Sequence, residues 1–313
     1  MREELGELGE RLLSPLPSED EADEKEWRPR PLAGPNITAV SRVCGRLYTL
    51  LLQLLLPLGY TQLLLGPTLL FGLMTRYNRF NVLAHLIKGG IFLALGVVTV
   101  LRFAGGFKSF GWSWSPPHRR PTFEMVESFL LLLYGAPNMF LERLANPGGA
   151  WSHGDLQHVA IAAMMAAGGI CGIVVEVVGC TVNPVPSAVV AALGVVVALH
   201  RQEDEVAKGL HVVWGAGLVW AAGWRWRTYA RRPDGRPASE LGVAGGLMLA
   251  GMVFMMSNRE TVRGLERAGG DVGLVVTVAV AVMFVGMAWG LGVMEIGRWA
   301  ERRGEWRGSG GDA

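Results

Sequence analysis

The sequence has few charged residues and few cysteines for its length. Asp, Glu, Lys and Arg make up 18% of the 313 residues, whereas a soluble domain has about 25%. The three cysteines, Cys44, Cys171 and Cys180, fit neither a disulfide framework nor a CxxC metal pattern. No GxSxG motif occurs, which argues against a serine hydrolase. The net charge of +2 is too small to indicate a nucleic-acid partner, and without a hydrophobic stretch near the N-terminus we expect no cleavable signal peptide.

Long apolar segments dominate the chain instead. Hydrophobic residues make up 50% of it, and about 20 consecutive apolar residues cross a bilayer as a helix. We therefore predict an all-α, polytopic transmembrane helix bundle in a lipid bilayer, with a seven-span core and one additional N-terminal apolar segment. The 43 glycines suit closely packed membrane helices. The eight apolar segments cover residues 47–74, 82–103, 122–144, 155–179, 186–200, 206–224, 241–256 and 272–296.

The first apolar segment determines the predicted domain boundaries. It is long enough to cross the bilayer, although Pro57 and Pro67 interrupt it, and we expect a full crossing. The polar ends of the chain are rich in charge, Pro, Gly or Ser, a composition typical of disorder. The predicted organisation is a disordered cytoplasmic tail over 1–46, the additional apolar segment over 47–74, a seven-span membrane domain over 80–300 and a disordered tail over 301–313.

The distribution of Lys and Arg predicts the orientation of the spans. The connections 104–121 and 225–239 and the C-terminal tail are the most basic, so we place them in the cytoplasm. In this topology, five of the six histidines lie near the opposite, non-cytoplasmic face. His118, in the basic connection, is the exception.

The histidines near the non-cytoplasmic face predict a metal site. Imidazole is a common ligand of Zn, Cu and Fe, and carboxylates can complete the shell. Such histidines also bond to backbone or water at the headgroup interface, so a polar network without metal stays open, as does a single haem. A two-haem electron carrier is disfavoured because it would need ligands at both faces. The predicted metal ligands are His85, His158, His200 and His211, with Glu142, His153 and Asp155 as further ligands or as hydrogen-bond partners of the ligands.

A second set of polar residues lies toward the cytoplasmic face. Glu124 and Glu127 are three residues apart at the start of one segment, and Glu176 stands near the end of another. Glu176 and His158 are 18 residues apart, so they share one face of a helix. These carboxylates are either interfacial ion pairs, neutralised by Arg119 and Arg120, or part of a polar path for protons or ions.

Several short motifs resemble a known family. They are His85 with the following KGGIFLALG, PTFEMVESF, GAPNMFLERL, WSHGDLQH, NPVPSAVVAALG leading to His200, and LHVVWG around His211. Over residues 80–300 the chain resembles the eukaryotic transmembrane protein forty-five family, and within it the fungal branch. The resemblance implies a seven-span membrane protein and no particular reaction.

We interpret the chain as a non-enzymatic multi-pass membrane protein with a histidine-rich, metal-binding site near the non-cytoplasmic face. The expected location is a secretory, endosomal or plasma membrane. One alternative is a metal-dependent enzyme in which the metal activates water for lipid hydrolysis, with catalytic residues unknown. The other is an ion- or proton-coupled transporter whose path runs from Glu176 to His158.

Overall fold

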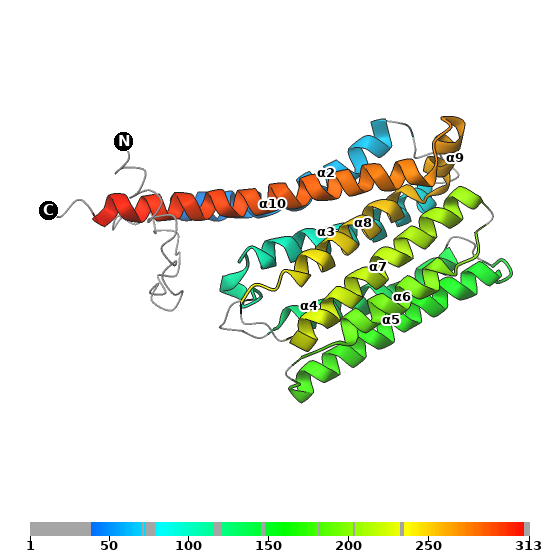
Figure 1. The fold of residues 1–313 in the computed structure, drawn as a ribbon, viewed down its shortest axis with the longest axis horizontal. Coiled ribbons are helices and arrows are strands. Elements are labelled where there is room, and N and C mark those ends of the chain that lie inside the picture. The colour runs from blue at the N-terminus through cyan, green and yellow to red at the C-terminus, as the bar shows by residue number, and fades with distance from the viewer. Residues whose placement is uncertain are drawn as a thin grey trace, which may run out of the picture. The chain divides into compact units, whose positions relative to one another are not determined.

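The computed structural model describes residues 39–70, 72, 79–114, 121–144, 148–180, 182–202, 204–231 and 235–309. Within these residues the secondary structure is helical and no strand occurs, so the all-α prediction is confirmed (Figure 1). The chain divides into two units, 1–59 and 60–313, and the second contains helices α3 to α10. The helices are α2 (Ala39–Leu70), α3 (Arg79–Phe103), η2 (Lys108–Phe110), α4 (Phe123–Leu144), α5 (His153–Val178), α6 (Val185–Ala198), α7 (Glu205–Arg231), α8 (Ser239–Met256), α9 (Arg259–Arg267) and α10 (Val272–Ser309).

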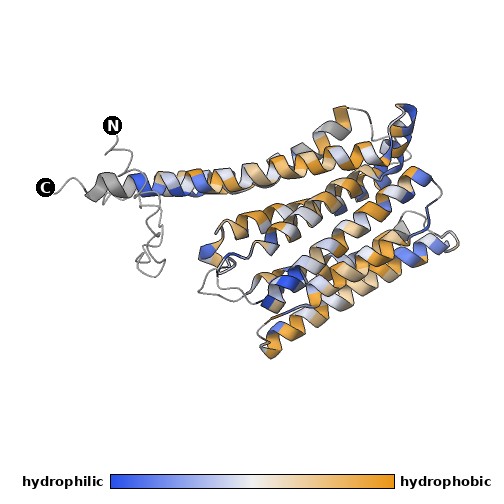
Figure 2. Cartoon of the chain, viewed as in Figure 1, coloured by the Kyte–Doolittle hydropathy of each residue, from blue (hydrophilic) through white to orange (hydrophobic). Residues whose placement is uncertain are grey.

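Apolar residues cover most of the helix surfaces, and hydrophilic residues gather near the helix ends (Figure 2). Four helices are long and apolar enough to cross a membrane: α3, α5, α8 and α10 over Val272–Arg303. The shorter α6 is also apolar. A helical protein with several candidate spans is therefore confirmed, whereas the count of seven spans stays a prediction.

Glycines allow the helices of the second unit to pack closely. α3 packs against α8, α4 against α5, α6 against α7, and α7 against α8. A Cβ atom added to Gly251 of α8 would lie 2.5 Å from the carbonyl oxygen of Gly89 in α3. The same substitution at Gly135 of α4 would place a Cβ 2.6 Å from the carbonyl oxygen of Ala162 in α5. The backbones therefore touch without intervening side chains, as small residues permit in membrane bundles.

Aromatic and aliphatic side chains fill the centre of this unit. Trp214 of α7 stacks on Phe254 of α8, with ring centroids 3.7 Å apart and the planes 6° from parallel. Leu210 and Leu218, one turn to either side of Trp214, are fully buried. This cluster joins α7 to α8, and Trp214 and Phe254 also line a cavity in this unit.

Three elements differ from the predicted boundaries. α7 continues to Arg231 rather than ending near residue 224. The connection 257–271 contains α9, which Asn258 caps by accepting a hydrogen bond from the Thr261 N–H at 3.0 Å. α10 continues to Ser309, although we expected disorder from residue 301. Ion pairs from Arg298 and Arg302 to Glu295 support the polar end of that helix. Residues 1–38 and 310–313 lie outside the described residues. The predicted N-terminal tail ended at residue 46, but residues 39–46 are the first part of α2.

Candidate functional site

A cavity of about 830 Å³ lies among α3, α4, α5, α6, α7 and α8. Its middle is lined by the buried apolar side chains of Phe92, Leu131, Met165, Leu193 and Leu247. Polar groups line its two ends, with histidines at one and an arginine and a carboxylate at the other. The cavity therefore has the layout of many ligand sites, which are mostly apolar with a few placed polar groups.

Four of the predicted ligands line this cavity. His85 comes from α3, His158 from α5, His200 from the α6–α7 connection and His211 from α7. The ring centroids of His158 and His200 are 5.3 Å apart, and those of His200 and His211 are 6.0 Å apart. The ring of His85 lies 4.9 Å from that of Phe254. The bundle thus brings together histidines that are up to 126 positions apart in the sequence, from 85 to 211.

Three of these histidines have their Nδ1 atoms fixed by oxygen acceptors. Nδ1 of His85 donates to the carbonyl oxygen of Asn81 at 2.7 Å, and Nδ1 of His211 to that of Ala207 at 2.8 Å. Nδ1 of His200 donates to Oε1 of Gln157 at 2.6 Å. Because a carbonyl oxygen only accepts, the proton of each neutral imidazole is on Nδ1 and Nε2 keeps its lone pair. This is the tautomer that metal-binding histidines commonly adopt when their second nitrogen is held.

His200 lies just after α6, outside the candidate spans, and its protonation is also constrained. Burial, with a smaller contribution from the neighbouring His158, His211 and His153, lowers the pKa of its imidazole from 6.5 to about 4. His200 is therefore neutral at physiological pH, as a metal ligand must be.

Two of the other predicted ligands, His153 and Asp155, lie at the start of α5, and the third is Glu142. Asp155 and Ser152 form a capping box, in which the Ser152 N–H donates to Asp155 Oδ2 at 2.9 Å and the Asp155 N–H donates to Ser152 Oγ at 3.1 Å. His153 is exposed at the first residue of the helix. The side chain of Glu142 lies outside the described residues. Within the described part of the chain, no three His, Cys, Asp or Glu side chains converge as a ready-made metal shell.

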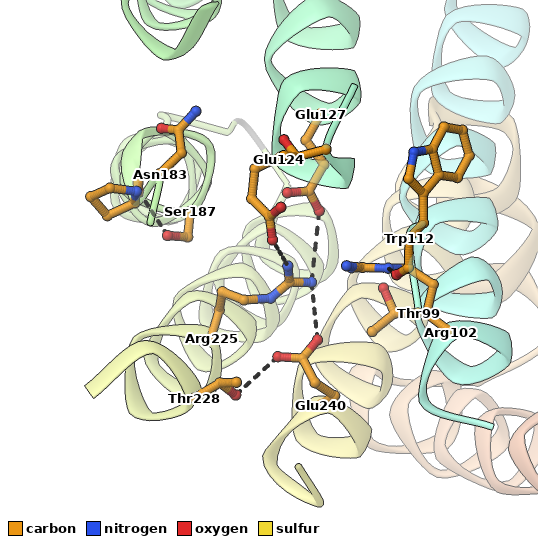
Figure 3. A network of polar contacts seen from close by, with 12 residues as sticks. Thr99, Arg102, Trp112, Glu124, Glu127, Asn183, Ser187, Arg225, Thr228 and Glu240 are labelled. Atoms are coloured by element: carbon orange, nitrogen blue, oxygen red, sulfur yellow. Dashed lines mark hydrogen bonds and ion pairs between the residues drawn. The ribbon is translucent and has the colours of Figure 1, made fainter. Parts of the chain in front are cut away.

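A buried ion-pair network occupies the other end of the cavity (Figure 3). The guanidinium of Arg225, from α7, lies 3.2 Å from Glu240 of α8 and 3.7 Å from each of Glu124 and Glu127 of α4. The Arg225 side chain is 4% exposed and that of Glu240 0%, so neither charge has water to solvate it. Thr228 Oγ1 donates a further hydrogen bond to Glu240 Oε1 at 2.9 Å.

A second arginine lies beside this network. Arg102 of α3 is buried, donates from Nε to the Trp112 carbonyl oxygen at 2.7 Å, and lies 3.8 Å from the ring centroid of Phe123. The cation–π contact and the hydrogen bond compensate part of the cost of burying its charge. Two arginines and three carboxylates thus meet at one end of the bundle.

The comparisons with known proteins identify the family. The family described as Protein YTP1-like, C-terminal, matches residues 58–298. The chain belongs to the YTP1-like family. No solved structure matches it.

The relatives of this YTP1-like chain include fungal membrane proteins. An uncharacterised membrane protein of Saccharomyces cerevisiae is 30% identical over 260 residues, covering 67% of this chain and 41% of the relative. An uncharacterised membrane protein of Schizosaccharomyces pombe is 31% identical over 325 residues, covering 89% of this chain and 62% of the relative. Protein YTP1 of Saccharomyces cerevisiae is 25% identical over 244 residues, covering 76% of this chain and 51% of the relative. The chain thus spans between two fifths and two thirds of the length of these relatives. These matches support a fungal membrane-protein family, but the name transmembrane protein forty-five is not confirmed.

The YTP1-like fold changes the roles expected for the acidic residues. Arg225, which we assigned to a cytoplasmic connection, is the partner of Glu124 and Glu127. Arg119 and Arg120 lie outside the described residues. Glu176 accepts a hydrogen bond from Asn183 Nδ2 at 3.4 Å, whereas Glu127 lines the cavity.

Sequence reasoning also missed the arginines and Glu240 as members of this site. The only sequence signal was the run of tryptophan and arginine from residue 224 to residue 227, which hydropathy assigns to a membrane boundary.

Proposed function

We propose that this chain is a multi-pass membrane protein that binds a transition-metal ion, Zn, Cu or Fe, at the histidine-lined end of its cavity. The observation that supports this most strongly is the shared hydrogen-bond pattern of His85, His200 and His211, which leaves the Nε2 lone pair of each available. We place the site near the non-cytoplasmic face, in agreement with the distribution of basic residues along the chain.

The spacing of the rings supports the same proposal. A metal–nitrogen distance of about 2.0–2.1 Å puts the ring centroids of two histidine ligands of one ion roughly 5 to 6 Å apart. The observed separations, 5.3 Å for His158 with His200 and 6.0 Å for His200 with His211, fall in this range. A bound ion would draw in the third ring or keep a water molecule as a further ligand.

A metal-dependent enzyme acting on lipid is the second candidate, because the histidines adjoin a long apolar cavity. In that case the metal would activate water for hydrolysis, and the cavity would hold the acyl chain. A transporter is the third candidate. Its path would use Glu127 rather than Glu176, because Glu127 lines the cavity.

The proposal predicts that His158→Ala loses bound metal. We expect purified wild-type protein to retain close to one ion per chain, measured by inductively coupled plasma mass spectrometry. Removing one imidazole ligand lowers metal affinity at least as much as the 10–100-fold typical for losing a hydrogen-bond partner of a ligand. His118→Ala, in the basic connection, should keep the wild-type content. Metal-free wild-type protein, or equal metal in both variants, would leave only a polar network at this position.

A further inference from the structure

The cavity is elongated and runs along the helices from the histidines to Arg225. Its lining extends from His211 to Arg225 on α7 and from Glu127 to Leu141 on α4, 14 positions in each case. At a rise of about 1.5 Å per residue, both stretches are about 21 Å long. Because an extended hydrocarbon chain rises roughly 1.25 Å per carbon, the cavity has the length of a chain of about 14 to 16 carbons.

The middle of the cavity suits such a chain, and one side of the cavity is exposed. The walls formed by Leu131 and Met165 are buried and apolar, and apolar cavities stay dry and take apolar ligands. Ile87 of α3 and Leu133 and Leu141 of α4 line the same cavity, yet they are 51%, 57% and 51% exposed. Side chains that line a cavity and are also exposed mark the place where it opens. A ligand from the hydrocarbon region of the bilayer can therefore enter there.

One hydrogen-bond donor and one acceptor are unpaired at the histidine end. Trp214 lines the cavity and is 6% exposed, and its Nε1–H has no acceptor among the residues that the structure describes. Nδ1 of His85 donates to the Asn81 carbonyl oxygen, so Nε2 keeps a lone pair, which receives no hydrogen bond from the described residues. The ring of Phe254 connects the two side chains, because its centroid lies 4.9 Å from that of His85 and 3.7 Å from that of Trp214.

These two groups indicate the chemistry of the ligand. A buried polar group without a partner costs about 1–3 kcal/mol, so a ligand that pairs with both groups is favoured. A hydroxyl donates one hydrogen bond and accepts others, whereas a carboxylate only accepts and cannot pair with the lone pair of His85. The selection depends on the direction of the hydrogen bonds and not on the charge of Lys88, whose Nζ lies 5.8 Å from the ring centroid of Tyr134.

We infer that the cavity binds a neutral single-chain lipid with a hydroxyl head group, which donates to Nε2 of His85 and accepts from Nε1 of Trp214. The hydrocarbon chain lies along the apolar middle of the cavity toward Arg225. This inference goes beyond the proposed metal site and does not require a bound metal. The ring spacings that suit an ion involve His158, His200 and His211, so His85 is left for the lipid.

The test is photolabelling of the full chain in phospholipid nanodiscs with a 16-carbon alcohol that bears a diazirine at mid-chain. We expect saturable labelling of peptides that contain Met165 or Leu193, competed by unlabelled hexadecanol. Hexadecyl methyl ether has the same chain but no proton to donate. It should compete at least about 5-fold more weakly, because Nε2 of His85 stays unpaired. Palmitate, an anion at neutral pH, should also compete more weakly than hexadecanol.

Depletion of metal separates this inference from the proposed function. Metal-depleted protein should label as the untreated protein does. Loss of labelling together with the metal would place the hydroxyl on the ion and overturn the inference. Wild-type protein that labels but contains no metal would contradict the proposed metal site alone.

Variants at the two polar groups sharpen the test. Each of His85→Phe and Trp214→Phe keeps an aromatic ring and removes one hydrogen-bonding atom. His85→Phe should lower competition by hexadecanol to the level of the ether, whereas Trp214→Phe should weaken both at least about 5-fold. Trp220→Phe, at a tryptophan of α7 that is 57% exposed, is the matched control and should compete as wild type.

Two results with wild-type protein would overturn the inference. One is labelling confined to bilayer-facing peptides of α10. The other is competition by the ether or by palmitate that equals competition by hexadecanol. These comparisons decide the matter even if the variants at His85 and Trp214 fail to fold.

Discussion

Replacing Arg225 by leucine is expected to unfold most of the protein. The substitution removes the cation shared by three carboxylates and leaves Glu240, with 0% exposure, without its ion-pair partner. Breaking a buried pair from one side costs about 3–5 kcal/mol, a large part of a typical total stability of about 5–15 kcal/mol. We expect a clear fall in the thermal transition and in the yield of monodisperse protein, measured by fluorescence-detected size-exclusion chromatography in detergent.

Two further variants separate this effect from a general loss of charge. Arg227→Leu changes an exposed arginine two residues along α7 and should melt close to wild type. Arg225→Leu combined with Glu240→Leu should recover part of the loss, because a buried ion pair can be replaced by apolar groups at little cost. Equal transitions for Arg225→Leu and Arg227→Leu would show that the network does not stabilise the bundle.

Replacing Gly251 by leucine should separate α3 from α8. A Cβ at this position would lie 2.5 Å from the Gly89 carbonyl oxygen and 2.6 Å from the Leu93 nitrogen. Both atoms are backbone, so relief requires α3 to move as a whole. Overpacking of this kind costs about 1–3 kcal/mol or more, and leucine adds further atoms beyond the Cβ. The same thermal measurement should show a large loss.

The control for this variant is another helical glycine. Gly223 of α7 has nothing within 4 Å of an added Cβ, so Gly223→Leu should leave the transition unchanged or raise it slightly, since glycine is a poor helix former. If the Gly251→Leu and Gly223→Leu variants unfolded at the same temperature, the close contact of α3 and α8 would not contribute to stability.

Hydropathy predicted the helices well because helix burial in a bilayer follows local composition. The apolar segments at 82–103 and 155–179 begin within three residues of α3 and α5. The C-terminal end of α7 was not predictable in this way. In the sequence, Arg225 resembles a charge at a membrane boundary. The structure shows instead that it pairs with Glu240 and Glu127 from other helices. Such pairing depends on tertiary packing between helices, and the hydropathy of a local stretch of sequence carries no information about it.

The candidate site was predictable only in part, because the sequence indicates the order of the spans but not which helices are in contact. Topology alone indicated that His85, His158, His200 and His211 share one face of the membrane, and all four line one cavity. Whether they bind a metal stays a prediction. Helical periodicity placed Glu176 on the same face as His158, but periodicity does not say which helix covers that face. Asn183, two residues before α6, donates a hydrogen bond to Glu176.

Contacts between glycines and the backbone of a neighbouring helix join the bundle into two groups of helices, which also meet where Gly168 of α5 packs on Val189 of α6. α4 and α5 form one, and α3, α8, α7 and α6 form the other, joined in series by backbone contacts. Polar contacts connect the two groups at both ends of the cavity: Arg225 with Glu127 at one, and His200 with Gln157 at the other. A rocking motion of α4 and α5 would therefore move α4 away from α3 and keep the glycine–backbone contacts within each group, but it would shift Gly168 of α5 against Val189 of α6. If an ion binds between His158 and His200 as we propose, it would tie α5 to the α6–α7 connection and so restrain that motion.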